Sequence, residues 1–387
     1  MSSSSSQPLA GRRIWIAGIG GAGMSAYALL AHAWGAEVAG WDRVDTPYLA
    51  HLSGIDFTIS PEPPEPPDGW EAYVSSAFIG RVPGRPRADL LAELVSLRRS
   101  IVVAGAHGKT TTSAMIAFCL DRLGLDPAFL IGGDVPQLGG NARAGEGWLV
   151  VEGDESDRSV AALRPEIAVL LNVDLDHHTT FASIAQVEEL FEEWLAHVPH
   201  VVRAERLAPA NLELAVPGEH NRLNAAAALA ALELAGIEGA ERVIVEFTGV
   251  GRRLQRRGER VFDSYAHHPA ELAADIAAVR DGGRVLALFQ PHLYSRTRYL
   301  AHEFAVALAA ADAVCVTDIY PAREEPIPGV TGRLIVDELA RLRPGMRIGW
   351  APALEDAARV VAGWARPGDT ILTLGAGDVD RAVDLLL

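Results

Sequence analysis

Two glycine-rich segments of the sequence have the composition and spacing of phosphate-binding loops. In the first, Gly18, Gly20 and Gly23 form a G-x-G-x-x-G pattern between a predicted strand and a predicted helix. Asp42 lies 19 residues after Gly23, where the next predicted strand ends. Such glycines let the backbone approach a diphosphate at a helix N-terminus, and the acidic side chain binds a ribose hydroxyl. The pattern predicts a diphosphate nucleotide without separating NAD from others, and a ligand-free tight turn is the alternative.

The second segment spans residues 105–112 and contains Gly-Lys-Thr at 108–110. It follows an apolar strand and begins a helix, so backbone N–H groups and the Lys109 ammonium would meet phosphate oxygens. The Thr110 hydroxyl would then reach Mg²⁺. Val103 stands where the general P-loop pattern has its first glycine. The segment is therefore interpreted as a short form of the P-loop, with a purely structural turn as the alternative.

Carboxylates and imidazoles follow two further predicted strands. The strand at 148–151 is followed by the acidic segment 152–157, and the strand at 167–173 by the Asp/His segment 174–178. α/β proteins place site residues at the ends of strands, and oxygen ligands at adjacent strand ends can reach one Mg²⁺ or its waters. Each segment alone is typical of a solvated strand end. Together, after a P-loop, they predict a metal and phosphate site.

The elements that must position these residues alternate along almost the whole chain. Short β-branched runs and Ala- and Leu-rich helical patterns follow one another, which predicts βαβ units with parallel sheets, an α/β fold. Three consecutive domains are expected, at residues 12–99, 100–247 and 248–387, after a disordered polar tail at 1–11. Strands are expected at or near residues 14–19, 37–42, 101–105, 148–151, 167–173, 261, 285–289, 313–317 and 370–374.

Composition limits the partners and the compartment. The 387 residues include 34 Lys and Arg against 50 Asp and Glu, a formal net charge of −16. This excess of negative charge opposes broad contact with nucleic acid or anionic lipid, so we expect neither nucleic acid nor a membrane as partner. Cys119 and Cys315 lie far apart in apolar contexts, which fits a reducing compartment. With neither a secretory signal nor an apolar run of spanning length, a cytoplasmic location is predicted.

The ordered set of motifs resembles the Mur ligase family, and the resemblance runs across nearly the whole chain. The matching segments are GIGGAGMS at 18–25, VSSA at 74–77, GAHGKTTT at 105–112, EGDESD at 152–157, NVDLDH at 172–177, GEHNRLNAA at 218–226, GRR at 251–253, YAHHP at 265–269, FQPHLYSRTR at 289–298 and GAGD at 375–378. The resemblance implies an N-terminal Rossmann-like domain for a UDP-sugar, a central P-loop ATPase-like domain with a parallel sheet, and a C-terminal Rossmann-like ligase domain.

The implied activity is an ATP-dependent amide ligation in peptidoglycan synthesis, and hence in cell wall biogenesis, cell shape and cell division. L-alanine would be joined to the carboxylate of UDP-N-acetylmuramate through an acyl phosphate, because an ionised carboxylate does not accept an amine at neutral pH. Phosphoryl transfer of this kind depends on positioning and charge neutralisation by Lys and Mg²⁺. The alternatives are a peptidoglycan-recycling ligase that takes a tripeptide, a nucleotide-binding paralogue without catalysis, and an NAD-dependent enzyme. A monomer or a homodimer is expected.

The resemblance also implies roles for particular residues. ATP would be bound by Gly105, His107, Gly108, Lys109, Thr110, Thr111, Asn221, Asn224 and Arg253. Mg²⁺, with Mn²⁺ as an alternative, would be bound by Thr110, Glu152 and His177. The UDP-sugar would be bound by Gly18, Gly20, Gly21, Gly23, Met24, Ser25, Asp42, Ser75, Ser76 and His107. Substrate carboxylates would be bound by His268, Arg296 and Arg298, since a guanidinium binds a carboxylate through two hydrogen bonds. The catalytic set is Lys109, Glu152, His177, Arg253, His268 and Asp263.

The chain departs from the family pattern at several places. Ser264 stands where the family has a second acidic residue before the aromatic, so Asp263 or another group is expected to replace that acid. Ala106 replaces a threonine of the P-loop, and Thr179 stands where an aspartate is usual. Fewer than twenty residues lie between Pro199 and Pro217, where the family has an extended β-rich stretch. The central sheet is therefore expected to lack strands on one side while ATP binding is retained.

Overall fold

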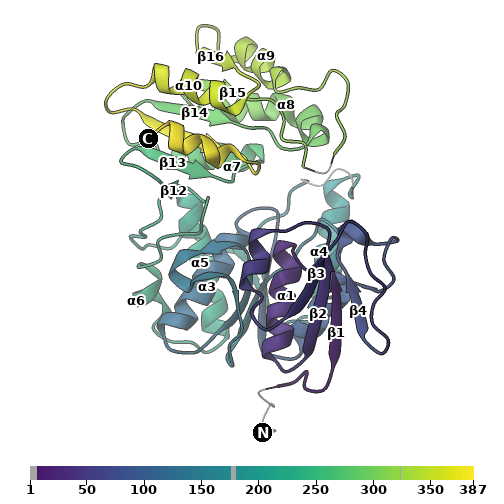
Figure 1. The fold of residues 1–387 in the computed structure, drawn as a ribbon. Helices are drawn as coiled ribbons and strands as arrows, with labels where there is room; N and C mark the ends of the chain where they lie inside the picture. Colours follow the sequence, from purple (N-terminus) through teal and green to yellow (C-terminus); the bar gives the residue numbers. More distant parts are fainter. Residues whose placement is uncertain (1–6, 176–179, 323) are drawn as a thin grey trace. The chain divides into compact units, whose positions relative to one another are not determined.

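A computed structural model describes residues 7–175, 180–322 and 324–387. Its strands form three sheets, and the chain divides into two compact units (Figure 1). The first unit comprises residues 1–210 and 223–247, and the second comprises residues 211–222 and 248–387. Within the described ranges, no helix has both the length and the apolar character needed to cross a membrane.

The N-terminal sheet of the first unit is parallel and has the order β3-β2-β1-β4-β5. Its strands are β1 (Arg13–Ala17), β2 (Glu37–Asp42), β3 (Asp56–Ile59), β4 (Glu71–Val74) and β5 (Arg85–Pro86). Helix α1 (Ala22–Ala33) follows the first glycine-rich loop, and helix α2 (Arg87–Ser96) follows β5. Because β1 is central and its residues after Arg13 are buried, the loop that follows it is held at the carboxyl edge of the sheet.

The central sheet of the first unit has the order β11-β10-β6-β9-β7-β8 and is parallel except for the pair β7 and β8. Its strands are β6 (Ser100–Ala104), β7 (Ala128–Val135), β8 (Gly140–Arg143), β9 (Leu149–Glu152), β10 (Ile167–Leu170) and β11 (His200–Arg203). The helices that follow them are α3 (Lys109–Arg122), α4 (Ile184–Leu195), α5 (Glu219–Leu234) and α6 (Ala240–Ile244). Strand β11 is the edge strand, and in the described chain no strand follows it before α5, as the short connection at 199–217 predicts.

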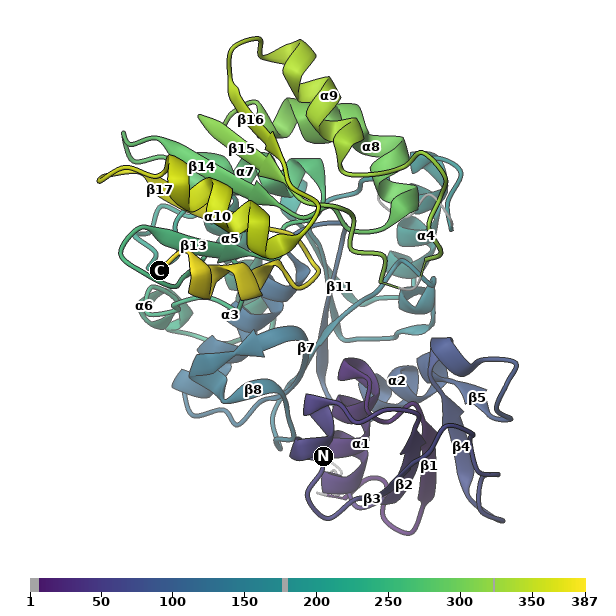
Figure 2. The ribbon, with the colours of Figure 1, turned by 45° about the horizontal axis from the view of Figure 1, so that its top comes forward.

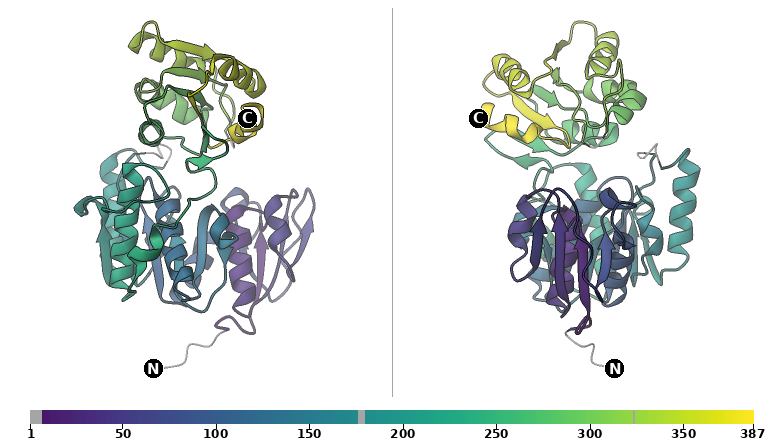
Figure 3. Two further views of the ribbon diagram at one scale, coloured as in Figure 1. Left: turned by 90° about the vertical axis from the view of Figure 1, so that its left-hand side faces the viewer. Right: turned by 45° about the vertical axis from the view of Figure 1, so that its right-hand side comes forward.

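One hydrophobic core joins both sheets of the first unit. It runs from Ile14 and Ile16 of β1 through Leu90 and Leu94 of α2 to Trp194 of α4. Helix α1 also packs on β7 and β8 of the central sheet. The two views of Figure 3 show these segments in purple, blue and teal. This shared core explains why the segments expected as two domains, 12–99 and 100–247, fall in one compact unit.

The second unit contains a sheet of the order β12-β13-β17-β14-β15-β16, parallel except at β12. Its strands are β12 (Gln255–Arg256), β13 (Val261–Ser264), β14 (Val285–Phe289), β15 (Ala313–Val316), β16 (Arg347–Trp350) and β17 (Thr370–Leu374). Its helices are α7 (Pro269–Ala278), α8 (Tyr294–Leu308), α9 (Arg333–Leu342) and α10 (Leu354–Trp364). Residues of α7, α8 and α9 share one core cluster and those of α10 share another, so the sheet is covered on both faces (Figure 2).

Candidate functional site: the two glycine-rich loops and the ligase unit

The P-loop lies between β6 and α3, with its backbone in conformations that require glycine. Gly105 has φ +128° and Gly108 has φ +87°, and a Cβ on Gly108 would lie 2.5 Å from Oδ1 of Asn224. The Asn172 side chain, which follows β10, accepts a hydrogen bond from the His107 N–H at 2.8 Å and donates one to the His107 carbonyl at 3.0 Å. The loop is therefore fixed with the N-terminus of α3 facing the space where phosphate would bind.

Lys109, the first residue of α3, is held by a buried carboxylate that the sequence interpretation left without a role. Its Nζ lies 3.1 and 3.0 Å from the two carboxylate oxygens of Glu155 and donates to the Gly105 carbonyl at 2.5 Å. Glu155 is only 3% exposed. Burial opposes the charge on Lys109, but the attraction and hydrogen bonds of Glu155 outweigh burial and raise the pKa of Lys109. The cation needed for phosphate is thus kept charged.

Two of the predicted metal ligands meet beside this lysine. The Thr110 hydroxyl donates to Oε2 of Glu152 at 3.1 Å, and the Gly132 N–H of β7 donates to Oε1 of Glu152 at 2.5 Å. A hydroxyl and a carboxylate are hard oxygen donors of the kind Mg²⁺ takes, so this pair fits the ion. His177, the third predicted ligand, lies outside the described residues.

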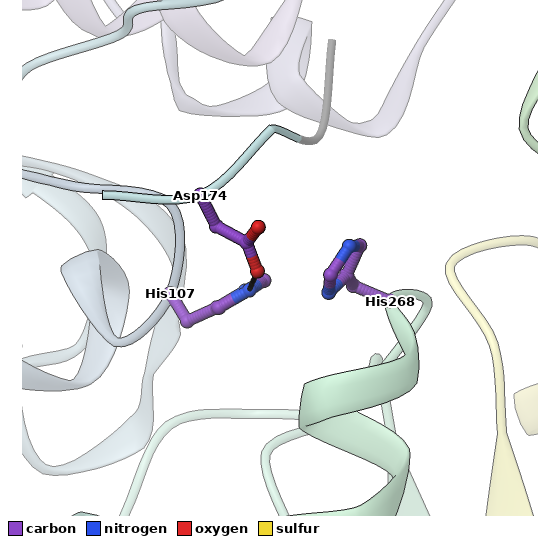
Figure 4. A group of neighbouring side chains, drawn as sticks. All are labelled: His107, Asp174 and His268. Carbon is purple, nitrogen blue, oxygen red and sulfur yellow. Dashed lines mark ion pairs between the residues drawn. The ribbon is translucent and has the colours of Figure 1, made fainter. Parts of the chain in front are cut away.

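His107 and Asp174 face each other at the same edge of the central sheet (Figure 4). Nε2 of His107 lies 3.5 Å from Oδ2 of Asp174, the latter a few residues after β10. His268, also drawn in Figure 4, belongs to the second unit. Asp174 thus joins the P-loop to the strand end from which the Asp/His segment begins.

Asp42, at the end of β2, forms a hydrogen bond with the backbone of the first glycine-rich loop. Oδ2 of Asp42 accepts from the Gly20 N–H at 2.8 Å. A Cβ on Gly18, which has φ +84°, would lie 2.8 Å from Cβ of Ser75, so Ser75 after β4 flanks this loop. Gly21 and Gly23 lie where α1 begins, and Ser76 opens the short turn after Ser75.

Two residues predicted to bind the UDP-sugar are packed inside the N-terminal half of the first unit. Met24 is 3% exposed and part of the core, and Ser25 is 6% exposed with its hydroxyl donating to the Ala22 carbonyl at 3.1 Å. Their side chains therefore support α1, and any contact they make with a ligand would come from the start of the helix backbone.

A cavity of about 310 Å³ lies between the two loops inside the first unit. Gly23 and Tyr27 of α1 line it together with Lys109, Glu152 and Arg87. The Arg87 guanidinium lies 3.2 Å from Asp154 and 2.7 Å from Asp157. Burial raises the pKa of Tyr27 to about 12. Sequence reasoning missed Arg87 and Tyr27, although Arg87 lies just before a helical pattern near the predicted boundary between two domains.

In the second unit, the tandem arginines before β12 have different partners. Arg252 lies 3.1 Å from Asp263 and donates to the carbonyls of Gly375 and Gly377 at 2.8 and 2.7 Å. Asp263 is fully buried and also accepts from Thr373 at 2.6 Å. Asp263, predicted as catalytic, thus lies in the interior of the sheet as the counter-ion of Arg252.

Arg253 lies 3.5 Å from Glu271 of α7, and His268 is the N-cap of that helix. The His268 side chain and the Glu271 side chain form a reciprocal capping box, which fixes the start of α7. Glu271 therefore holds both Arg253 and His268 at the N-terminal end of α7.

The predicted carboxylate-binding arginines of α8 differ in exposure. Arg296 is 6% exposed and lies 3.3 Å from Nδ1 of His292, whereas Arg298 is exposed and lies 3.1 Å from the Tyr299 hydroxyl. Of the asparagines on α5, Asn224 faces Gly108 of the P-loop, and Asn221 donates to the Pro217 carbonyl at 2.6 Å. The structure thus groups Asn224 with the P-loop.

Two family models match the chain and together cover more than half of it. The Mur ligase middle domain matches residues 103–204. The Mur ligase, glutamate ligase domain, matches residues 250–377. The first match contains the P-loop and Glu152, and the second contains Arg253, His268 and Arg296.

Curated relatives cover nearly the full length. The UDP-N-acetylmuramate--L-alanine ligase of Streptomyces coelicolor is 38% identical over 454 residues, which covers 96% of this chain and 96% of the relative. The ligase of the same name from Rubrobacter xylanophilus is 36% identical over 446 residues, covering 97% and 99%. Both alignments are longer than the 387 residues of this chain, so the relatives contain segments without a counterpart here.

Solved structures match the fold over nearly the whole chain. UDP-N-acetylmuramate-alanine ligase MurC from Thermotoga maritima matches with a TM-score of 0.76 at 26% identity, covering 97% of this chain and 98% of that chain. A murein peptide ligase from Psychrobacter arcticus matches in fold with a TM-score of 0.60 at 22% identity, covering 97% and 98%. The predicted α/β fold class is confirmed, and the chain belongs to the Mur ligase family.

Proposed function

We propose that this protein is an ATP-dependent ligase that joins L-alanine to the carboxylate of UDP-N-acetylmuramate in peptidoglycan synthesis. The observation that carries the proposal is the identity of 36 to 38% to relatives of that name over nearly the whole of both chains. The P-loop geometry supports it, because Lys109, Thr110 and Glu152 are assembled beside the N-terminus of α3.

The first chemical step would be phosphoryl transfer. An oxygen of the substrate carboxylate attacks the γ-phosphorus of ATP, the bond to the β,γ-bridging oxygen breaks, and ADP leaves. Lys109 and the backbone N–H groups at the start of α3 would hold the phosphates. Thr110 and Glu152 would hold Mg²⁺, or Mn²⁺ as an alternative, and the bound ion supplies charge neutralisation.

The second step would form the amide bond. The amino group of L-alanine attacks the acyl carbon, inorganic phosphate leaves, and the ammonium proton goes to a base. Arg296, Arg298 and His268 are the proposed ligands of substrate carboxylate, and Arg253 is a proposed phosphate ligand. The first glycine-rich loop, with Gly18 to Gly23 flanked by Ser75, is the proposed site of the UDP diphosphate.

The test is ADP release measured with UDP-N-acetylmuramate and a panel of acceptors. We expect release that depends on both the sugar nucleotide and L-alanine, and that is abolished in Lys109→Met. Turnover with a tripeptide and none with L-alanine would instead identify a peptidoglycan-recycling ligase. This alternative is included because the chain also matches the murein peptide ligase in fold. Binding of both nucleotides with no ADP release for any acceptor would identify the non-catalytic paralogue.

The proposed substrates also set the compartment. ATP and a nucleotide sugar are cytoplasmic metabolites, so we place the protein in the cytoplasm, with a monomer or homodimer as its assembly. Fractionation of the native host would test the location, and sedimentation of the purified chain would test the assembly.

A further inference from the structure

Helix α7 of the second unit carries a buried carboxylate with no role in the steps above. Asp275 is 8% exposed, and its Oδ2 accepts a short hydrogen bond from the Ser264 hydroxyl at the end of β13. Ser264 is itself 1% exposed, and its Oγ also accepts from the Ala266 N–H at 3.1 Å. Burying a carboxylate costs free energy of folding, and its hydrogen bonds offset only part of that cost. We therefore expect the pair of Ser264 and Asp275 to have a functional role as well as a packing role.

The other oxygen of Asp275 faces the first turn of α5. Nε2 of His220 lies 3.9 Å from Oδ1 of Asp275. Gly218, with φ +101°, leaves room for the imidazole, because a Cβ there would lie 2.6 Å from Cε1 of His220. Asp275 therefore joins three segments of the second unit: the end of β13, helix α7 and the first turn of α5.

Two of these segments continue directly into proposed site residues. The turn after Ser264 leads to His268, the N-cap of α7, and His220 is followed by Asn221. We infer that Asp275 is a positioning residue for the ligation reaction, which through Ser264 and His220 holds the segments carrying His268 and Asn221 in their working positions. The inference rests on the proposed function for its catalytic readout.

The titratable and charged groups that face Asp275 include His220 of α5, Glu271 of α7 and Arg253 before β12. Burial raises the pKa of Asp275 to about 7, against the hydrogen bond from Ser264, and Glu271 raises it while Arg253 lowers it. Burial lowers the pKa of His220. Ionisation of Asp275 near neutral pH would strengthen the hydrogen bond that it accepts from Ser264.

The central variant is Asp275→Asn, which keeps the size and the hydrogen bond to Ser264 but removes the charge. We expect kcat to fall on the order of 10- to 100-fold with a smaller change in KM for L-alanine, since positioning errors of this kind act mainly on the reacting geometry. The acid limb of the kcat profile near pH 7 should also disappear. Asp337→Asn is the control, because Asp337 is a half-exposed residue of α9 whose ion pair is with the exposed Arg333.

An exchange of the two residues separates positioning from loss of fold. Ser264→Asp alone would place two carboxylates in contact and lower activity and stability. The double exchange Ser264→Asp with Asp275→Ser rebuilds one carboxylate and one hydroxyl, and we expect it to recover at least half of the lost kcat on a logarithmic scale. No recovery, or a kcat of Asp275→Asn within twofold of wild type, would overturn the inference.

A readout that is independent of ligation keeps this test distinct from that of the proposed function. The imidazole NMR signals of His220, followed in the full chain, should report the ionisation of Asp275 near pH 7 in wild type and lose that titration step in Asp275→Asn. The Kd for ADP with Mg²⁺ should rise several-fold. If wild type forms no amide with any acceptor, the proposed function fails, while an unchanged titration of the His220 signals and an unchanged Kd would refute the positioning role itself.

Discussion

The contact between Lys109 and Glu155 provides the sharpest test of how the phosphate site is built. Both side chains are largely buried, with 19% and 4% of the side chain exposed, and the ammonium lies 3.0 to 3.1 Å from both carboxylate oxygens. Glu155→Gln keeps the shape and removes the charge. Breaking a buried ion pair in this way leaves an uncompensated cation and costs about 3 kcal/mol.

That cost is measurable as a loss of thermal stability. For a unit of this size, about 3 kcal/mol corresponds to a Tm lower by about 6 to 12 °C. Glu192→Gln is the matched control, because Glu192 is paired with Arg203 but is 61% exposed, and such surface pairs contribute about 1 kcal/mol or less.

The pH dependence gives a second signature with a defined sign. In wild type, Glu155 raises the pKa of Lys109 above its ordinary value, so the pair's stabilisation is complete below that value and is lost only as the pH rises through the raised pKa. In Glu155→Gln, burial is the largest remaining influence and lowers the pKa of Lys109, against a weaker attraction from Asp154 and Glu152. The stability of the variant should therefore increase from pH 7 to pH 10, whereas that of wild type should not.

Nucleotide binding completes the assay. The phosphates of ADP with Mg²⁺ would replace the missing carboxylate as partners of Lys109, so the nucleotide should raise the Tm of Glu155→Gln more than that of wild type. Differential scanning fluorimetry at several pH values, with and without nucleotide, measures all three effects. A variant as stable as wild type, with a flat pH dependence and an ordinary nucleotide shift, would refute this account of the site.

Two further predictions concern the glycine of the P-loop and the arginine of the cavity. Gly108→Ala should weaken ATP binding at least tenfold by calorimetry, because its Cβ would lie 2.5 Å from Asn224 in addition to the strain at φ +87°. Gly124→Ala is the control for strain alone, since Gly124 has φ +73° and a Cβ there would meet no atom within 4 Å. If both variants bound ATP equally well, the clash with Asn224 would be refuted. Arg87→Met should raise KM for UDP-N-acetylmuramate about tenfold or more, because the cavity keeps Lys109 but loses the guanidinium, and Asp154 and Asp157 lose their partner. The exposed Arg85→Met is its control, and an unchanged KM would remove Arg87 from the site.

The local parts of the site were predictable from the sequence because they depend on neighbouring residues. A glycine-rich loop between a buried strand and a helix needs only short-range sequence, and β6, the P-loop and α3 lie where the pattern predicts. The same holds for strand β2 and for Glu152 at the end of β9. The fold class followed from the alternation of strand and helix patterns over the chain.

The partners of those residues came only from the tertiary structure. Glu155 is 46 residues from Lys109 in sequence, and Asp154 is 67 residues from Arg87, so no local pattern joins them. Ser264 stands where the family has an acidic residue, and the structure places the carboxylate of Asp275 beside it. Asp275 reaches this position because α7 packs against the end of β13.

Sequence by itself determined which residues could do the chemistry and in which α/β elements they lie, since backbone conformation and strand or helix periodicity are local. Tertiary structure decided which of them are buried as counter-ions, as Asp263 is with Arg252, and which carboxylate holds the phosphate-binding lysine. The physical reason is that the charge state and position of a buried group depend on the groups that folding brings against it. The distance between two residues along the sequence does not show whether folding will bring them together.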